Sequence, residues 1–210
     1  MTGRFITLEG IEGAGKSTIA KFVLGWLAQR QIPGRLTREP GGTPLAERIR
    51  QLVLERGAEP LSPVTETLLM FAARDLHLQH VIRPALARGE WVVCDRFTDA
   101  TRAYQGSGRG VDPGLIDSLA AAVHGGLAPD CTLLLDLPVS VGLARARGRA
   151  TGESDRFEAE TQAFFEKVRS GYLELARCEP ERFQVIDATA PLEAVEARVE
   201  HILEDLEDLA

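Results

Sequence analysis

Short apolar runs alternate along this chain with longer amphipathic segments. The apolar runs predict buried strands at residues 5–8, 91–94, 132–137 and 183–186, with a weaker strand at 35–37. Between them, apolar side chains recur with helical spacing in seven segments: 18–30, 43–56, 64–88, 112–123, 139–147, 157–177 and 191–208. Strands that alternate with helices are typical of a parallel sheet covered on both faces. The pattern therefore predicts an α/β fold with a five-stranded parallel sheet flanked by helices.

Composition and charge narrow the class of protein. The 210 residues suit one α/β domain, and no repeat or low-complexity segment divides them. A formal net charge of −7 argues against nucleic-acid binding. No apolar run approaches the ~20 residues that cross a bilayer, and the first strand begins too early for a signal peptide. Cys94, Cys131 and Cys178 are widely spaced, which favours reduced thiols, so we expect a cytoplasmic protein without membrane contact.

Residues 10–17, between the first predicted strand and the first predicted helix, match the phosphate-loop pattern GxxxxGK[ST]. Glycines let the backbone approach an anion closely, and a helix N-terminus directs N–H groups toward it. Lys16 supplies a charge for the outer phosphates, and the Ser17 hydroxyl can bind Mg²⁺. We expect a nucleotide-phosphate site made of Gly10, Ile11, Glu12, Gly13, Ala14, Gly15, Lys16, Ser17 and Thr18.

Polar residues follow each predicted strand, at the edge where such sheets bind ligands. Glu9, residues 37–43, Asp95, Asp136 and Asp187 occupy these positions. The pattern predicts a site at this edge. Each aspartate could instead cap the turn that follows its strand, which is the commoner role of such a residue.

An arginine-rich segment lies after the fourth predicted strand, with Arg145, Arg147, Arg149 and Arg156 among small residues. Such a segment is usually a solvated loop. In a phosphate-loop protein it can also close as a lid, exclude water and supply charge to the transferring phosphoryl group. The Asn-Lys-x-Asp pattern of GTPases is absent. These features favour a kinase.

Several further segments are more specific than the phosphate loop. They are residues 9–18, 37–43 (TREPGGT), 71–74 (FAAR), 95–97 (DRF), 103–106 (AYQG), 155–158 (DRFE) and 186–189 (IDAT). In this order they make the chain resemble the bacterial thymidylate kinases over essentially its whole length. The resemblance implies a three-layer P-loop nucleoside monophosphate kinase fold, one domain over residues 1–210 and a flexible lid at about 145–156. It also implies transfer of the ATP γ-phosphoryl group to dTMP, giving dTDP for dTTP biosynthesis, by a homodimer with Mg²⁺.

The acceptor in this reaction is a phosphate oxygen with a pKa of about 6, so no general base is needed. The site must hold two polyanions in line and neutralise their repulsion. The resemblance assigns this role to Lys16, Arg96 and one of the lid arginines Arg147, Arg149 and Arg156. Arg38 is a further candidate for the dTMP phosphate. The resemblance assigns Asp95 to orienting Arg96 and the water molecules of the metal, which the Ser17 hydroxyl can bind. A structural ion pair between Asp95 and Arg96 is the alternative.

Binding of dTMP, both its phosphate and its nucleoside, is implied for a second set: Glu12, Arg38, Phe71, Arg74, Arg96, Thr101, Tyr104 and Gln105. Phe71 would stack on thymine, although its helical spacing also suits a core residue. Arg74 would donate to O4, where cytosine carries a donor of its own, and Thr101 and Gln105 would meet the N3 edge. Tyr104 would exclude a ribose 2′-hydroxyl, and Glu12 would accept from the 3′-hydroxyl.

Two positions depart from the family, and two other functions stay open. Many members carry Tyr at the position of Phe97. Some relatives carry an arginine at the position of Gly13, so in this chain the lid should supply the catalytic arginine.

A kinase for another monophosphate, or for a deoxynucleoside with Glu9 or Glu39 as base, is one alternative function. A phosphate-loop switch ATPase is the other. Segment 64–88 is the expected dimer face.

Overall fold

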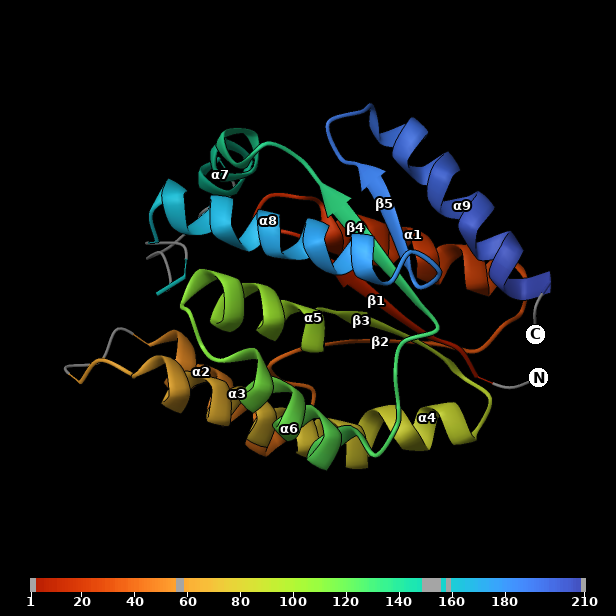
Figure 1. Cartoon of the computed structure of the whole chain (residues 1–210). Helices are drawn as coiled ribbons and strands as arrows, with labels where there is room; N and C mark the ends of the chain where they lie inside the picture. Colours follow the sequence, from red (N-terminus) through yellow and green to blue (C-terminus); the bar gives the residue numbers. More distant parts are fainter. Residues whose placement is uncertain (1–2, 56–58, 149–155, 158–159, 209–210) are drawn as a thin grey trace.

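The computed structural model describes residues 3–55, 59–148, 156–157 and 160–208. A sheet of five parallel strands in the order β2-β3-β1-β4-β5 forms its centre (Figure 1). The strands are β1 (Phe5–Glu9), β2 (Gly34–Arg38), β3 (Trp91–Asp95), β4 (Cys131–Asp136) and β5 (Phe183–Asp187). Each overlaps the apolar run that predicts it, so the expected five-stranded parallel sheet is confirmed.

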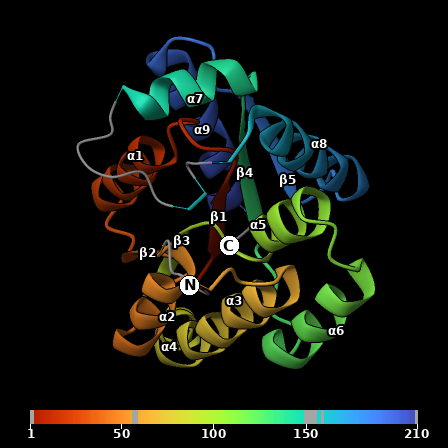
Figure 2. The ribbon, with the colours of Figure 1, turned by 90° about the vertical axis from the view of Figure 1, so that its left-hand side faces the viewer.

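Helices cover both faces of this sheet. They are α1 (Lys16–Gln29), α2 (Pro44–Leu54), α3 (Pro63–His77), α4 (Arg83–Ala87), α5 (Thr98–Thr101), α6 (Pro113–His124), α7 (Val139–Arg147), α8 (Gln162–Cys178) and α9 (Leu192–Asp208). α1 and α9 pack on one face and α4 and α8 on the other, with α5 against α8. Figure 2 shows α1 and α8 on opposite sides of β1 and β4. None of the helices in the described ranges is long and apolar enough to span a membrane.

Alternate residues of a strand point to opposite faces, which explains why the strands read as continuous apolar runs. Ile6 and Leu8 of β1 join the main hydrophobic cluster, to which α1 and α9 contribute. Phe5 belongs to a second cluster with Val92 and Cys94 of β3 and with side chains of the helical segment 78–85. The named strand side chains on both faces are fully buried.

Two regions differ from the predicted pattern. The helix expected at 64–88 is interrupted by a π-helical turn, η1 (Leu78–Ile82), between α3 and α4. Residues 98–108, where no helix is predicted, form α5 and the π-helical η2 (Arg102–Gly108). Their buried face is partly polar: Asp99 is 2% exposed and is bound by Arg182 at 2.6 Å. A helix that buries polar side chains lacks the apolar period used for prediction.

The helix expected from residue 157 begins later, at Gln162. Thr161 has an extended backbone, and its hydroxyl accepts a hydrogen bond from the Phe164 N–H at 3.2 Å. An N-cap of this kind satisfies one of the free N–H groups of the first turn. The start of α8 is therefore set by Thr161.

The central strands β1, β3 and β4 are buried along almost their whole length. Leu133 on β4 is fully buried in the main cluster. We expect Leu133→Ala to lower the free energy of unfolding by about 2–5 kcal/mol, because it removes buried methyl groups and leaves a cavity. Leu192→Ala is the control: Leu192 is 49% exposed, so the change should stay within about 0.5 kcal/mol. Urea unfolding of both variants measures this, and equal losses would contradict the proposed core.

Candidate active site

Two adjoining cavities lie at the carboxyl ends of the strands. One, the inner cavity, has a volume of about 140 Å³ and a partly apolar wall. The other, the P-loop cavity, has a volume of about 360 Å³ and lies beside residues of the phosphate loop. The residues that line both are Glu12, Glu39, Arg50 and Arg96. The arrangement offers a half-apolar compartment that opens directly into a strongly charged one.

The phosphate loop forms the floor of the P-loop cavity. Gly13, Gly15, Lys16 and Ser17 line it, and α1 begins at Lys16. The Lys16 ammonium donates to the carbonyl oxygens of Gly10 and the next residue, Ile11, both at 3.0 Å. Burial and the nearby Arg96 lower the pKa of Lys16 to about 8. An anion in the cavity would favour the charged form and offer the ammonium a stronger partner than two carbonyls.

Gly13 brings the base of the predicted lid against the phosphate loop. Its φ is +76°, and a Cβ there would stand 1.9 Å from the carbonyl oxygen of Gly142 on α7. Conversely, a Cβ on Gly142 would stand 2.6 Å from the Glu12 carbonyl oxygen. Only glycine permits both the backbone conformation and this close approach. No side chain fits at Gly13, so an arginine at this position is excluded in this structure.

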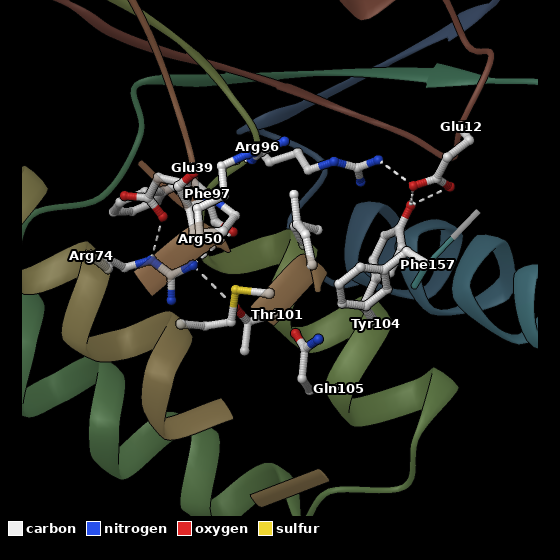
Figure 3. A pocket seen from close by; sticks show the side chains of 14 residues that line it. Glu12, Glu39, Arg50, Arg74, Arg96, Phe97, Thr101, Tyr104, Gln105 and Phe157 are labelled. Carbon is white, nitrogen blue, oxygen red and sulfur yellow. Dashed lines mark hydrogen bonds and ion pairs between the residues drawn. The ribbon is translucent and has the colours of Figure 1, made fainter. Parts of the chain in front are cut away.

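Arg96, which directly follows β3, connects the two cavities. Its φ is +71°, a rare conformation for a residue other than glycine. Its guanidinium donates to Glu12 at 2.9 Å and to the Gly10 carbonyl at 3.1 Å. The Tyr104 hydroxyl donates to the same Glu12 carboxylate at 2.8 Å (Figure 3). The ion pair of Arg96 is thus formed with Glu12, and among the described residues none joins it to Asp95.

Arg74 enters the wall of the inner cavity from α3 and is 2% exposed. It donates to Glu39 at 2.7 Å and to the Thr101 hydroxyl at 3.0 Å (Figure 3). Glu39 also forms a hydrogen bond through Oε1 with Nδ1 of the His77 ring, at 2.9 Å. Burial alone would raise the pKa of Glu39, but Arg74 and His77 hold it below its ordinary value. Within the described part of the chain, Nη1 of Arg74 has no hydrogen-bond partner, so donor capacity remains.

Phe71 does not line either cavity, contrary to the expected stacking role. It is 2% exposed and packs with Val111 and Ile116 in a separate cluster at α6. Met70, four residues before Arg74, lies in the cavity wall instead. Residues at i and i+4 share a helix face, which explains why Met70 accompanies Arg74. Phe71 is the core residue that its helical spacing also allowed.

The other predicted nucleoside-binding residues lie near these cavities. Thr101, Tyr104 and Gln105 of α5 and η2 line the inner cavity with Arg74, and Arg38 lines the P-loop cavity. Arg50 of α2 also lines both cavities, although no motif in the sequence marks it as a site residue. It stands in an ordinary amphipathic helix pattern, which carries no signal for this position.

The two predicted lid arginines that the structure describes, Arg147 and Arg156, lie in different surroundings. Arg147 is exposed at the end of α7, next to Ala146, which lines the P-loop cavity. Arg149 and most of the predicted lid fall outside the described residues. Arg156 is not brought to the P-loop cavity: it donates to Glu66 of α3 and, at 3.0 Å, to the Val53 carbonyl.

The strand-end aspartates have different roles. Asp136 forms a bidentate pair with Arg169, at 2.7 and 2.8 Å. Asp187 caps its own turn by accepting from Thr189. Asp95 alone of these three lines the P-loop cavity, where Ser17 is a neighbour. No group of three or more metal-ligating side chains occurs among the described residues.

Residues 8–199 match the family model described as thymidylate kinase. The chain belongs to this family. It is 56% identical over 209 residues to a thymidylate kinase of Pseudomonas savastanoi pv. phaseolicola, covering 100% of this chain and 99% of that protein. It is 57% identical over 202 residues to a thymidylate kinase of Alkalilimnicola ehrlichii, covering 96% and 92%. A crystal structure of thymidylate kinase from Ehrlichia chaffeensis superimposes with a TM-score of 0.76 at 33% identity, covering 97% and 99%. The predicted family, kinase class and fold are confirmed.

Glu9, the first residue of the 9–18 segment, is a buried acid whose hydrogen-bond partners the sequence did not predict. It is fully buried at the end of β1 and accepts from the Phe97 N–H and the Tyr172 hydroxyl, both at 2.7 Å. Burial and the charge of Asp99 raise its pKa from 4.5 to about 8. Its two hydrogen bonds tie the turn after β3 to β1 and α8.

The raised pKa of Glu9 predicts a pH-dependent stability. Between pH 4.5 and 8 the folded protein holds a proton that the unfolded chain releases, so stability falls as the pH rises. In Glu9→Gln this contribution is absent. We expect the slope of unfolding free energy against pH to be less negative in the variant, by up to about 1.4 kcal/mol per pH unit. Urea titrations from pH 5 to 8 measure it, and parallel curves would contradict the raised pKa.

Proposed function

We propose that this chain transfers the γ-phosphoryl group of ATP to dTMP and releases dTDP. The observation that carries the proposal is the junction of the two cavities at Arg96 and Glu12. A half-apolar compartment suits a nucleoside, and a basic compartment on a phosphate loop suits the phosphates. Two nucleotides that meet at this junction bring an acceptor phosphate next to a transferring one.

Selection of thymine is assigned to the inner cavity. Arg74 has donor capacity left for a carbonyl at O4, where cytosine offers an amino group that would oppose it. Thr101 and Gln105 are proposed to face the N3 edge, and Met70 to lie against the base in the place expected for Phe71. Tyr104 and Glu12 are proposed to meet the sugar. The Tyr104 ring packs edge-on against Phe157, with 5.9 Å between the ring centroids. This packing supports the proposal that Tyr104 excludes a 2′-hydroxyl.

Charge neutralisation is assigned to cations around the P-loop cavity: Lys16, Arg38 and Arg96. The acceptor phosphate is already largely ionised near neutral pH, so the chain need not remove a proton. Glu9 and Glu39, the candidate bases of a deoxynucleoside kinase, are both engaged in buried hydrogen bonds. These engagements support a monophosphate acceptor over a nucleoside.

Mg²⁺ fits the residues of the P-loop cavity. Mg²⁺ is usually held by one or two protein oxygens together with substrate phosphates. Ser17 and Asp95 offer one hydroxyl and one carboxylate in the same cavity, without a complete protein cage. When bound, the ion would neutralise charge on the phosphates. We propose Ser17 as a direct partner and Asp95 as a partner of its water molecules.

One kinase domain is proposed over residues 1–210, with a lid at about 145–156. The protein is proposed to work in the cytoplasm as a homodimer.

Segment 64–88 is the proposed dimer face. Val64 and Leu68 on α3 are 46% and 47% exposed, and Leu45 and Leu52 on the neighbouring α2 are 50% and 58% exposed. Large apolar side chains that gather on a surface favour a protein interface.

Turnover of a panel of acceptors tests this function. We expect dTMP to be phosphorylated best and dUMP about 10-fold less efficiently, because a missing methyl group costs ~1–3 kcal/mol. dCMP, the ribonucleotide of thymine and thymidine should be poor acceptors. Coupled ADP release measures kcat/KM for each, with Lys16→Ala as the control for contaminating kinases. Equal efficiency with dCMP, or ADP release without any acceptor, would contradict the proposal.

The source of the catalytic arginine is a separate prediction. We propose that Arg147, at the end of α7, supplies charge to the transferring phosphoryl group and that Arg156 anchors the lid through Glu66. Arg147→Ala should lower kcat by up to about 10³-fold, by analogy with arginine fingers. Arg156→Ala should lower kcat far less. Arg147→Lys should restore little of the lost kcat, because an ammonium cannot make the planar two-pronged contact of a guanidinium. A normal kcat in Arg147→Ala with a loss in Arg149→Ala would assign the role to Arg149.

A further inference from the structure

Glu66 is a fully buried carboxylate in the first turn of α3, beyond the wall of the inner cavity. Its Oε1 accepts from the Gln105 side-chain amide at 2.6 Å and from Arg109 Nε at 2.9 Å. Its Oε2 accepts from Arg156. One carboxylate therefore joins a residue of the inner cavity, a residue that follows η2 and a residue of the lid.

The partners of Glu66 determine which end of the Gln105 amide faces it. Two guanidinium groups, which can only donate, face this carboxylate, one at each oxygen, so both oxygens act as acceptors. The amide NH₂ of Gln105 must then be the end that points to Glu66. A reversed amide would set its oxygen against the carboxylate at 2.6 Å, where both groups repel.

The other end of the amide is left for the inner cavity. Gln105 is 1% exposed and belongs to the cavity wall, where Figure 3 shows it among the lining side chains. In the part of the chain that the structure describes, no group donates to its Oε1. A bound base would therefore meet an acceptor at this point. Thymine carries a donor at N3, whereas N3 of neutral cytosine is itself an acceptor.

We propose that Glu66 is a positioning residue for base selection: it holds the Gln105 amide with Oε1 toward the base and so favours thymine over cytosine. The inference rests on the proposed function and deepens it, since Gln105 alone could present either end. Arg109 and Arg156 offset the cost of burying the carboxylate. Arg109 is anchored in turn by Glu160 at 2.8 Å.

Glu66→Gln tests the role of the charge with little change in shape. A glutamine at 66 can present either NH₂ or oxygen to Gln105, so the amide is no longer forced into one orientation. We expect the ratio of kcat/KM for dTMP over dCMP to fall about 10-fold, the effect of one misdirected hydrogen bond of ~1.4 kcal/mol. An unchanged ratio would overturn the proposal.

Glu160→Gln is the matched control. Glu160 also pairs with Arg109, but no hydrogen bond joins it to Gln105 among the described contacts. This variant removes a negative charge from the same arginine and leaves the amide partner intact. We expect a wild-type ratio of dTMP over dCMP. A fall equal to that of Glu66→Gln would assign the effect to Arg109 and overturn the role of the amide.

A double-variant cycle separates positioning from general stability. If Glu66 acts through Gln105, then Glu66→Gln should not change the dTMP/dCMP ratio further once Gln105→Ala is present. An additional fall in the double variant would overturn the proposal. Wild-type protein without dTMP activity would contradict the proposed function instead, which keeps the two failures distinguishable.

The wild-type chain provides a second measurement, should Glu66→Gln fail to fold. The ¹⁵N-labelled side-chain amide of Gln105, assigned by its loss in Gln105→Ala, should give NH₂ signals protected from exchange. These signals should remain protected when dTMP binds, because the NH₂ end stays on Glu66. Loss of protection on dTMP binding would show that the NH₂ turns to the base, and would overturn the proposal.

Discussion

The cost of burying charge governs the arrangement of this site. A buried ionised group is tolerated only when partners compensate for the water it loses. Glu39 is held by Arg74 and His77, and Glu66 is held by Arg109 and Arg156. Each pairing joins elements that are distant in sequence. The requirement to pair these charges therefore also sets the positions of the groups that face the cavities.

A second constraint is the close approach of backbone at Gly13 and Gly142. The contact leaves no space for a side chain on either glycine and fixes α7 against the phosphate loop. α7 leads directly into the arginine-rich segment, so the base of the predicted lid lies against the phosphate loop. The same contact excludes a side-chain cation within the loop at Gly13. Beyond the charge of Lys16, an arginine for the transferring phosphoryl group would therefore come from outside the loop in this chain.

Sequence reasoning was most reliable where the signal was local. The five strands and most helices follow from apolar period, and the phosphate loop follows from a contiguous motif in its strand-helix context. It did not reveal that α3 is apolar on two faces, with Met70 facing the cavity and Phe71 facing α6. It also found no helix at residues 98–108, where the buried side is partly polar. In both cases the hydrophobic pattern carries no information about which neighbour covers a given face.

The sequence by itself determined the alternation of strands and helices along the chain, the phosphate loop and the family. It determined them because they depend on residues close together along the chain. Only the tertiary structure decided the partners of Glu9, Glu66 and Arg156. Gln105 and Arg156 reach Glu66 from 39 and 90 positions away. Contacts over such separations depend on how the helices pack, and packing selects partners by shape and by the need to compensate buried charge.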